Sequence, residues 1–325
     1  MKILIIRFSS IGDIVLTSPV IRCLKQQVKN AQVHYLTKNS FASLVQNNPH
    51  VDQVFRIDKN VSEVLDSLKK EHYDHVIDLH HNLRSMQVKR ALGKPSRSID
   101  KLNIEKWLLV NFKINVLPQK HIVNRYFETV AHLGVKNDQK GMEFFIDAKD
   151  IVSISTLSPE FQNGYVAFVI GAKHNTKKLP TEKIISICKK LNRPVILVGG
   201  NEDVEEGEKI TAQIPHSFNA CGKYNLQQSA SLIKQAEKVI THDTGMMHIA
   251  AAFRKKIISV WGNTVPEFGM YPYMPGHEEN LETTGSKIVE VTGLPCRPCS
   301  KIGFDKCPQG HFKCMNEIDE TAFIT

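Results

Sequence analysis

Short apolar runs alternate with stretches of helical periodicity in the first half of the chain. Compact apolar runs indicate buried strands, and apolar positions three and four residues apart indicate helices. The predicted strands are Lys2–Arg7, Gln32–Thr37, Gln53–Ile57 and His75–Leu79, and the predicted helices are Asp13–Asn30, Ser40–Gln46, Ser62–Lys70, Leu83–Ala91, Asn103–Leu109 and Ile122–His132. Short strands separated by amphipathic helices predict βαβ units and a parallel sheet.

The alternation stops over residues 148–163 and starts again after Gly164. The second half is predicted to contain the strands Tyr165–Ile170, Val195–Val198, Lys238–Thr241 and Lys256–Val260, and the helices Thr181–Leu191, Glu202–Ala212, Leu226–Ala236 and Met246–Phe253. We therefore predict an α/β protein of two parallel-sheet domains, residues 1–155 and 156–325, with a cleft between them.

Length and composition agree with two globular domains. The chain has 325 residues, which suits two domains of about 150 residues each. Hydrophobic residues make up 42% and charged residues 23% of it. No apolar run approaches the roughly 18 residues of a membrane-spanning helix, and Arg7 interrupts the first run too early for a signal peptide. We expect a cytoplasmic protein.

Positive charge is concentrated in the first half. The formal net charge is +9, and residues 79–125 contain ten basic residues against two acidic ones. This excess indicates an anionic partner, although a solvated basic face is the alternative. We predict that the stretch forms one wall of the cleft and that Arg84, just beyond a strand, grips an anionic group, while Lys89, Arg90 and Lys94 add long-range attraction. Nucleic acid is not the expected partner, because no recognition motif or aromatic run is present.

The loop after the first strand contains small and polar residues, Ser9, Ser10, Gly12 and Asp13. Sites of α/β proteins lie at the carboxyl ends of parallel strands. These residues are therefore candidates for substrate binding and catalysis. The alternative is that Gly12 permits a turn and Asp13 caps a helix.

Two further loops follow strands of the second half. In VITHDTGMMH, Asp243, Thr244 and Gly245 precede a helix whose first backbone N–H groups can bind an anion; the alternative is an N-cap with a packed His248. In VIGAKHNTKKLP, lysines could bind a diphosphate, or could form an ordinary surface loop. The chain lacks the Walker A pattern and the G-x-G-x-x-G fingerprint, so a P-loop kinase and a dinucleotide oxidoreductase are not favoured.

Four of the seven cysteines cluster near the C-terminus with the spacing C-x2-C-x7-C-x6-C: Cys296, Cys299, Cys307 and Cys314. Four thiolates in a short segment could hold a structural zinc ion, but the spacing is not that of a standard zinc ribbon, so reduced loop thiols are the favoured interpretation. Disulfides are not expected in a cytoplasmic protein.

Several of these segments resemble glycosyltransferase family 9, the heptosyltransferases of lipopolysaccharide core assembly. They are SSIGDIVLTSP after the first strand, the lysine loop ending in KKLP, and DTGMMHIAAA. The segment DLHHNLRSMQVKR is similar to the family's D-x-x-x-N-x-R-S, and the cysteine-bearing tail is similar to that of one subgroup. The resemblance implies a GT-B architecture of two Rossmann-like domains facing a central cleft, with the acceptor on the N-terminal domain and the nucleotide-sugar on the C-terminal one.

The resemblance also implies roles for individual residues. Asp13 matches the general base, and Lys177 matches the lysine that neutralises the donor diphosphate. The implied donor-binding residues are Lys173, Asp243, Thr244, Gly245, Met246 and His248, and the implied acceptor-binding residues are Ser9, Ser10, Gly12, Asn82 and Arg84. Ala172-Lys173 stands where well-known members have a Thr-Thr pair.

The implied activity is inverting transfer of a heptose-type sugar, without a metal for the chemistry. The expected donor is ADP-heptose, and the expected acceptor is an anionic lipid-linked glycan of the lipopolysaccharide core type. Such an acceptor implies contact with the inner face of the inner membrane. Two alternatives remain: a nucleotide-sugar epimerase of the UDP-N-acetylglucosamine type with the same fold, and a non-catalytic basic protein that binds glycan or nucleic acid.

Overall fold

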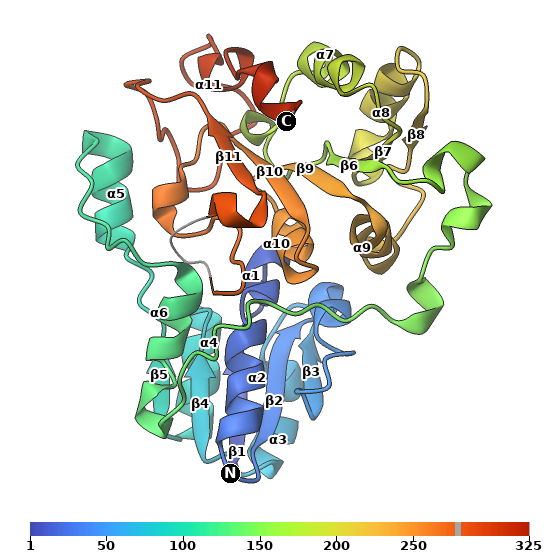
Figure 1. Ribbon diagram of the computed structural model, residues 1–325. Helices are drawn as coiled ribbons and strands as arrows, with labels where there is room; N and C mark the ends of the chain where they lie inside the picture. The colour runs from blue at the N-terminus through green and yellow to red at the C-terminus, as the bar shows by residue number, and fades with distance from the viewer. Residues whose placement is uncertain (277–280, 325) are drawn as a thin grey trace. The chain divides into compact units, whose positions relative to one another are not determined.

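The computed structural model describes residues 1–276 and 281–324. The chain forms two compact units (Figure 1), of which the first comprises Met1–Lys101 and Lys120–Phe145 and the second Leu102–Gln119 and Ile146–Thr325. Residues 102–119 thus belong to the second unit, whereas a division at residue 155 would assign them to the first. The basic stretch 79–125 is accordingly divided between the two units.

The first unit is built on a five-stranded parallel sheet of order β3-β2-β1-β4-β5. Its strands are β1 (Lys2–Ile6), β2 (Gln32–Lys38), β3 (Gln53–Ile57), β4 (His75–Asp78) and β5 (Ser96–Ser98). Its helices are α1 (Ile11–Val15), α2 (Ser18–Gln27), α3 (Ser62–Lys70), α4 (Leu83–Leu92) and α6 (Ile122–Glu128). The central strand β1 is apolar on both faces, and Ile3, Leu4, Ile5 and Ile6 are fully buried, as a covered parallel sheet requires.

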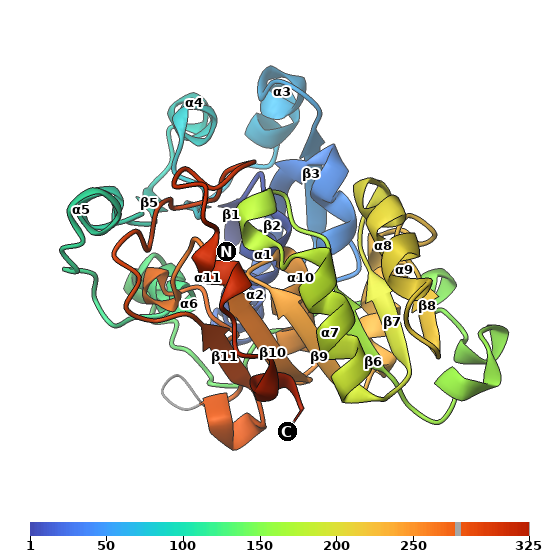
Figure 2. The same cartoon turned by 90° about the horizontal axis from the view of Figure 1, so that it is seen from above.

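The second unit contains a six-stranded parallel sheet of order β11-β10-β9-β6-β7-β8, whose strands lie side by side in Figure 2. Its strands are β6 (Val166–Val169), β7 (Val195–Val198), β8 (Ser217–Asn219), β9 (Lys238–His242), β10 (Lys256–Trp261) and β11 (Lys287–Glu290). Its helices are α5 (Asn103–Phe112), α7 (Thr181–Leu191), α8 (Val204–Thr211), α9 (Leu226–Gln235), α10 (Gly245–Ala252) and α11 (Lys313–Asn316). Two Rossmann-like parallel sheets confirm the predicted fold class.

The predicted helix Asp13–Asn30 is wrong in one respect, because it is broken into α1 and α2. Pro19 has no N–H to donate to the carbonyl of Val15, so the first helix cannot continue through this point. The Thr17 hydroxyl donates to the carbonyl of Ile14 (2.7 Å), and the second helix then starts with Pro19 in its first turn, where proline is tolerated. The break separates the short α1, which contains Asp13, from the long α2.

Three strands were not predicted, namely β5, β8 and β11. Each has only three or four residues and lies at an edge of its sheet. An edge strand is covered less completely than a central one, so its sequence needs no continuous apolar run. No helix within residues 1–276 and 281–324 is long and apolar enough to cross a membrane.

Candidate active site

The loop after β1 holds Asp13 in a network of its own neighbours. Oδ1 of Asp13 lies 2.7 Å from Nη2 of Arg7, while Oδ2 accepts hydrogen bonds from the Ser10 hydroxyl (2.6 Å) and the Ser10 backbone N–H (3.1 Å). Asp13 is the third residue of α1, so its carboxylate satisfies an otherwise unpaired N–H at the helix start. Its side chain is still 21% exposed, which leaves it accessible to a ligand.

The same network fixes the ionisation of Asp13. Burial alone would raise the pKa of this carboxyl group, but the charge of Arg7 and the hydrogen bonds from Ser10 outweigh burial and lower the pKa below its ordinary range. Asp13 is therefore a carboxylate at neutral pH. It can accept a proton, as a general base must.

Arg7 was not among the predicted site residues, although it precedes the loop directly. Its Nε donates to the carbonyl of Ser9 (2.7 Å), and its Nη1 donates to the carbonyl of Leu79 at the end of β4. β4 pairs with β1 on the side opposite β2, so Arg7 ties together the loops on either side of the topological switch point of this sheet. Ser9, Ser10 and Gly12 belong to one of these loops, and Asn82 and Arg84 belong to the other.

The loop after β4 is organised by a buried carboxylate. Asp78 is fully buried, accepts hydrogen bonds from the backbone N–H groups of His80 (3.1 Å) and His81 (2.7 Å), and pairs with Lys89 at 2.9 Å. Lys89 is thus a structural partner of Asp78, and the prediction that it supplies long-range attraction is wrong. The Asn82 side chain accepts a hydrogen bond from the N–H of Ser85 (3.0 Å) and caps α4.

Arg84 is the second residue of α4 and is exposed. Its position beyond the end of β4, at the same sheet edge as Asp13, is the one that the sequence predicted. An exposed guanidinium at this edge can bind a carboxylate or phosphate with two parallel hydrogen bonds.

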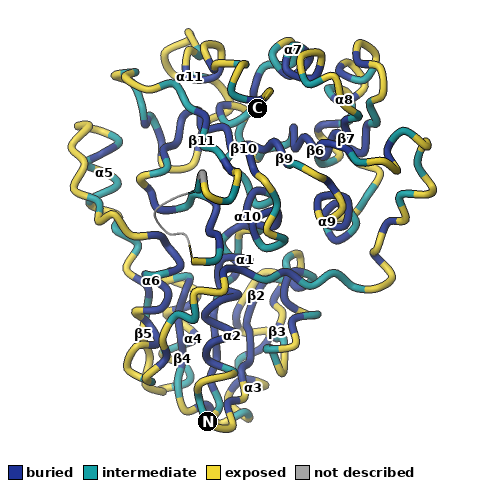
Figure 3. Tube along the Cα trace, viewed as in Figure 1, coloured by how far each residue is buried: buried dark blue, intermediate teal, exposed yellow. Residues whose placement is uncertain are grey.

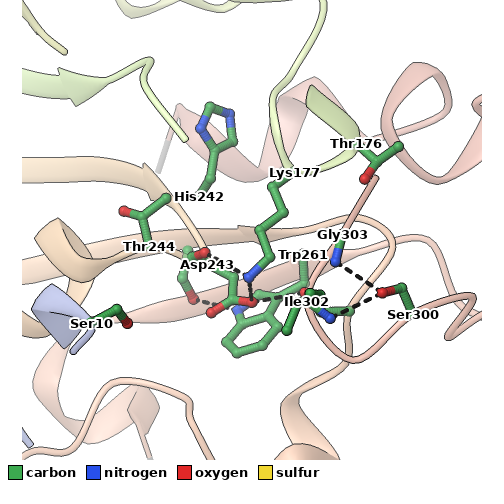
Figure 4. A network of polar contacts seen from close by, with 12 residues as sticks. Ser10, Thr176, Lys177, His242, Asp243, Thr244, Trp261, Ser300, Ile302 and Gly303 are labelled. Atoms are coloured by element: carbon green, nitrogen blue, oxygen red, sulfur yellow. Dashed lines mark hydrogen bonds and ion pairs between the residues drawn. The ribbon is translucent and has the colours of Figure 1, made fainter. Parts of the chain in front are cut away.

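In the second unit, Lys177 and Asp243 come together (Figure 4). Nζ of Lys177 lies 2.5 Å from Oδ2 of Asp243 and 3.2 Å from its backbone carbonyl, and the Thr264 hydroxyl donates to Oδ2 at 2.8 Å. Lys177 follows β6 and Asp243 follows β9, which are paired strands. The two loops therefore flank the switch point of the second sheet, where ligands of open α/β sheets bind.

Buried contacts hold the Lys177 loop on both sides. Nε2 of His242 accepts the backbone N–H of Leu179 (2.9 Å), and burial, with the nearby charges of Lys178 and Lys177, lowers the pKa of His242 to about 3. His242 is therefore neutral, with its proton on Nδ1. The hydroxyl of Thr176 both donates to the carbonyl of Phe304 (3.0 Å) and accepts its N–H (2.8 Å), which fastens the loop to the C-terminal tail. Neither His242 nor Thr176 was predicted as part of the site.

The three lysines of this loop have different environments. Lys178 pairs with Asp203, which is buried, so the charge of Lys178 is balanced by a carboxylate within the second unit. Lys173 is exposed. Lys177 is partly buried, with 16% of its side chain exposed, and it is the lysine aimed at the DTG loop.

The DTG loop leads directly into α10. Asp243, Thr244, Gly245 and Met246 are partly exposed, and Thr244 is the N-cap. The first backbone N–H groups of a helix have no partner within it and attract anions. His248 lies within α10 and is buried. An anion at this helix start would lie beside the Lys177 ammonium group.

Asn263 next to Thr264 was also missed. Its side chain is 1% exposed, and within the described ranges neither its amide nitrogen nor its amide oxygen has a hydrogen-bond partner. A buried amide in this state needs water or a ligand. No sequence pattern marks this asparagine, because its burial and its missing hydrogen bonds are visible only in the folded unit.

The structure gives no support for a zinc site in the cysteine tail. No group of three or more His, Cys, Asp or Glu side chains in the part of the chain that the structure describes could hold a metal ion. Cys314 packs into the core of the second unit beside Ile318 and Phe323, and burial raises the pKa of its thiol to about 12. As an ordinary protein thiol it is therefore neutral at physiological pH.

Known proteins resemble this chain over most of its length. The family model of glycosyltransferase family 9 (heptosyltransferase) matches residues 61–290. Lipopolysaccharide heptosyltransferase 1 of Campylobacter coli is 23% identical over 319 residues, which cover 90% of each chain. The structure of a family 9 glycosyl transferase from Veillonella parvula has a TM-score of 0.78 at 21% identity, covering 99% of this chain and 95% of that one. The E. coli ADP-heptose lipopolysaccharide heptosyltransferase II has a TM-score of 0.72 at 21% identity, over 98% of both chains.

Proposed function

The chain belongs to glycosyltransferase family 9, and from this membership and the two sites we propose that it transfers heptose from ADP-heptose to an anionic lipopolysaccharide-core acceptor. In this proposal the first unit binds the acceptor and the second unit binds the donor. The observation that carries the proposal is the meeting of Lys177 and the DTG loop at the switch point of the second sheet. A lysine beside a helix N-terminus suits the diphosphate of a nucleotide-sugar.

The proposed reaction is a single displacement. The Asp13 carboxylate accepts the proton of an acceptor hydroxyl, and the oxygen attacks the anomeric carbon of the heptose. The bond between that carbon and the donor phosphate breaks, and the electron pair leaves on ADP. Attack opposite the leaving group inverts the anomeric configuration. Lys177 and the start of α10 stabilise the charge that develops on the diphosphate, so the proposed chemistry uses no metal or other cofactor.

The test separates this activity from the epimerase alternative. Purified protein is incubated with ADP-heptose, with and without a lipopolysaccharide-core acceptor, and the products are identified by mass spectrometry. Transfer predicts a heptosylated acceptor and free ADP only when the acceptor is present. Conversion of a UDP-sugar without any acceptor would instead support epimerisation. ADP is also expected to raise the melting temperature more than UDP or GDP, since a ligand that binds only the folded state stabilises it.

Arg84 provides a test of the acceptor side. Replacing Arg84 with alanine is expected to raise the apparent KM for the acceptor about 10- to 150-fold and to leave the KM for ADP-heptose nearly unchanged. A hydrogen-bonded charged contact in a complex contributes about 1.5–3 kcal/mol, which corresponds to this range. Steady-state kinetics with each substrate varied in turn measure both constants.

Arg90 is the matched control, because it is an exposed arginine on the same helix, six residues further along and on a different face. Arg90→Ala should cost far less, and its effect should shrink at high salt. Equal weakening of donor and acceptor by Arg84→Ala, or no weakening of either, would show that Arg84 is not an acceptor contact.

The proposed acceptor is linked to lipid, so the enzyme would act at the inner face of the inner membrane. Lipid-linked acceptors cannot leave the bilayer surface, and the protein must therefore approach it. Turnover of acceptor embedded in vesicles, compared with turnover of a water-soluble acceptor of the same sugars, measures whether the protein works at a surface.

A further inference from the structure

The turn after β10 contains the residue that holds Asp243. Residues 262–264 follow directly on β10, which Figure 3 shows mostly in the colour of buried residues. The Thr264 hydroxyl donates to Oδ2 of Asp243 at 2.8 Å, and the same oxygen lies 2.5 Å from Nζ of Lys177. The Asp243 oxygen that meets Lys177 is thus also held by Thr264.

The guanidinium group of Arg297 fixes the backbone of this turn. Its Nε donates to the carbonyl of Gly262 (2.6 Å) and its Nη2 to the carbonyl of Thr264 (2.9 Å), while its Nη1 donates to the carbonyl of Val291 (2.7 Å). Nη2 also lies 2.7 Å from Oε2 of Glu290, which balances the charge of the guanidinium. A guanidinium is planar and its N–H groups have fixed directions, so the two carbonyls of the turn cannot move independently of each other.

A second residue of the tail and the Lys177 loop contact the same turn. The backbone N–H of Cys299 donates to the carbonyl of Asn263 (3.2 Å), so each of the three successive carbonyls of residues 262–264 is bonded to residue 297 or 299. A Cβ atom at Gly262 would lie 2.9 Å from the carbonyl oxygen of Thr176, so the turn approaches this closely only because the residue is glycine. The turn therefore packs against the residue that precedes Lys177.

We propose that Arg297 is a positioning residue of the donor site: it holds Thr264 so that Asp243 and Lys177 present a fixed geometry to the diphosphate. The side chain of Arg297 is 7% exposed, and its N–H groups are used in four hydrogen bonds within the unit. Arg297 therefore acts through Thr264 and does not touch the donor. This role rests on the proposed binding of a nucleotide-sugar by the second unit.

A fixed turn matters because the charge of Lys177 is shared. Asp243 and the donor diphosphate are both negative, and both attract the Lys177 ammonium group. Without the Thr264 hydroxyl the Asp243 carboxylate loses a donor, and its attraction for Lys177 competes more strongly with that of the diphosphate. Charged groups stabilise a developing charge best when they are held in place beforehand, and a displacement of about 1 Å can lower the rate about 10²-fold.

The experiment compares the full chain with its variants Arg297→Lys and Arg297→Met. Lysine keeps a positive charge beside Glu290, but its ammonium group cannot bind the carbonyls of Gly262 and Thr264 with the fixed fork of a guanidinium. Both variants should raise the Kd for ADP and lower kcat/KM for the donor about 10- to 100-fold. The KM for the acceptor should stay near that of the wild type. Calorimetric titration with ADP and steady-state kinetics measure these constants.

Lys183→Met is the matched control, because Lys183 also ties the C-terminal tail to the second unit through backbone carbonyls. Its Nζ donates to the carbonyls of Asn316 (2.6 Å) and Ile318 (2.8 Å). This variant should lower the melting temperature and keep the wild-type Kd for ADP and kcat. A loss of ADP affinity that only follows a loss of stability would occur in Lys183→Met as well.

A double-mutant cycle tests whether Arg297 acts through Thr264. Thr264→Val removes the hydroxyl group and should raise the Kd for ADP by a factor similar to that of Arg297→Lys. If the two residues form one path, the combined variant should bind ADP little more weakly than either single variant. Independent effects would instead multiply.

Three results would overturn the proposal: a wild-type Kd for ADP in Arg297→Lys, an equal loss of ADP affinity in Lys183→Met, or multiplying effects of Arg297→Lys and Thr264→Val. The first would show that Arg297 only balances the charge of Glu290, and the other two that it supports the fold in general. A wild-type protein that neither binds ADP nor transfers heptose would overturn the proposed function itself.

Discussion

Replacing Asp13 with asparagine is expected to lower kcat about 10²–10⁴-fold, the usual contribution of a general base. Asparagine has the same shape and can still accept the hydrogen bonds from Ser10, but it cannot take a proton. Binding of ADP should be unchanged, because the donor is assigned to the second unit. Initial rates with saturating substrates, together with ADP titration by calorimetry, measure the two quantities separately.

Glu63 offers a matched control for this variant. It is a first-turn carboxylate of α3, and it accepts the backbone N–H groups of Asp58, Lys59 and Asn60. Glu63→Gln removes the charge of a helix-start carboxylate from the same unit without touching the site. If Asp13→Asn loses no more activity than Glu63→Gln, Asp13 is merely a cap and the proposed chemistry is wrong.

The pH dependence of the rate tests the role of Arg7. The pKa of Asp13 is lowered, so its basic form exists throughout the neutral range and is lost only as the pH falls through that lowered value. Arg7→Met removes the opposing charge, so burial is then offset only by the hydrogen bonds from Ser10 and the pKa of Asp13 rises relative to the wild type. The acidic limb of the kcat profile should therefore move to higher pH, with partial recovery of the rate at alkaline pH. A rate loss that is the same at every pH would assign Arg7 a structural role only.

Replacing Lys177 with methionine is the second change with a large expected effect. It removes the positive charge proposed to stabilise the leaving diphosphate, and a single preorganised group of this kind contributes about 10²–10³-fold to kcat. The affinity for ADP should fall as well. Stability should change little, because Asp243 keeps its hydrogen bond from Thr264 and is partly exposed to water.

Lys178→Met is the matched control from the next position. Lys178 is the partner of Asp203, which is 1% exposed, so this variant leaves a buried carboxylate without its counter-charge. It should destabilise the protein by about 3 kcal/mol while the folded fraction keeps its kcat. Thermal unfolding and active-site-normalised rates separate the two variants. The assignment of Lys177 fails if its replacement lowers the melting temperature but not kcat.

Hydrophobic patterning was enough to predict the central strands of both sheets. β1, β6 and β9 are covered on both faces, and their apolar runs are recognisable without any tertiary information. The same patterning missed β5, β8 and β11, which are short strands at sheet edges. It also missed the break between α1 and α2, although Pro19 marks it in the sequence.

Site residues could be predicted where they follow a strand. They could not be predicted where their role depends on a contact with a residue distant in sequence. Asp13, Lys177 and Asp243 lie in the segments that follow β1, β6 and β9. The predicted strands were therefore enough to find them. Arg7 was missed because it donates to the carbonyl of Leu79, and His242 because it accepts the N–H of Leu179. Each partner is more than sixty residues away in sequence. Lys89 was expected only to add long-range attraction, because the burial of its partner Asp78 cannot be recognised from residue type alone.

The assignment of residues 102–119 to the second unit has a consequence for dividing the protein into separate pieces. The chain passes between the two units three times, near residues 101, 119 and 145, so no single cut separates them. A fragment ending at residue 145 would carry Leu109 without the Val265 and Phe268 side chains that cover it. The complementary fragment would in turn expose Val265 and Phe268 to water. Each half would therefore expose apolar side chains and tend to aggregate when made alone. Complementation from separately expressed pieces would require α5 to be part of the C-terminal piece.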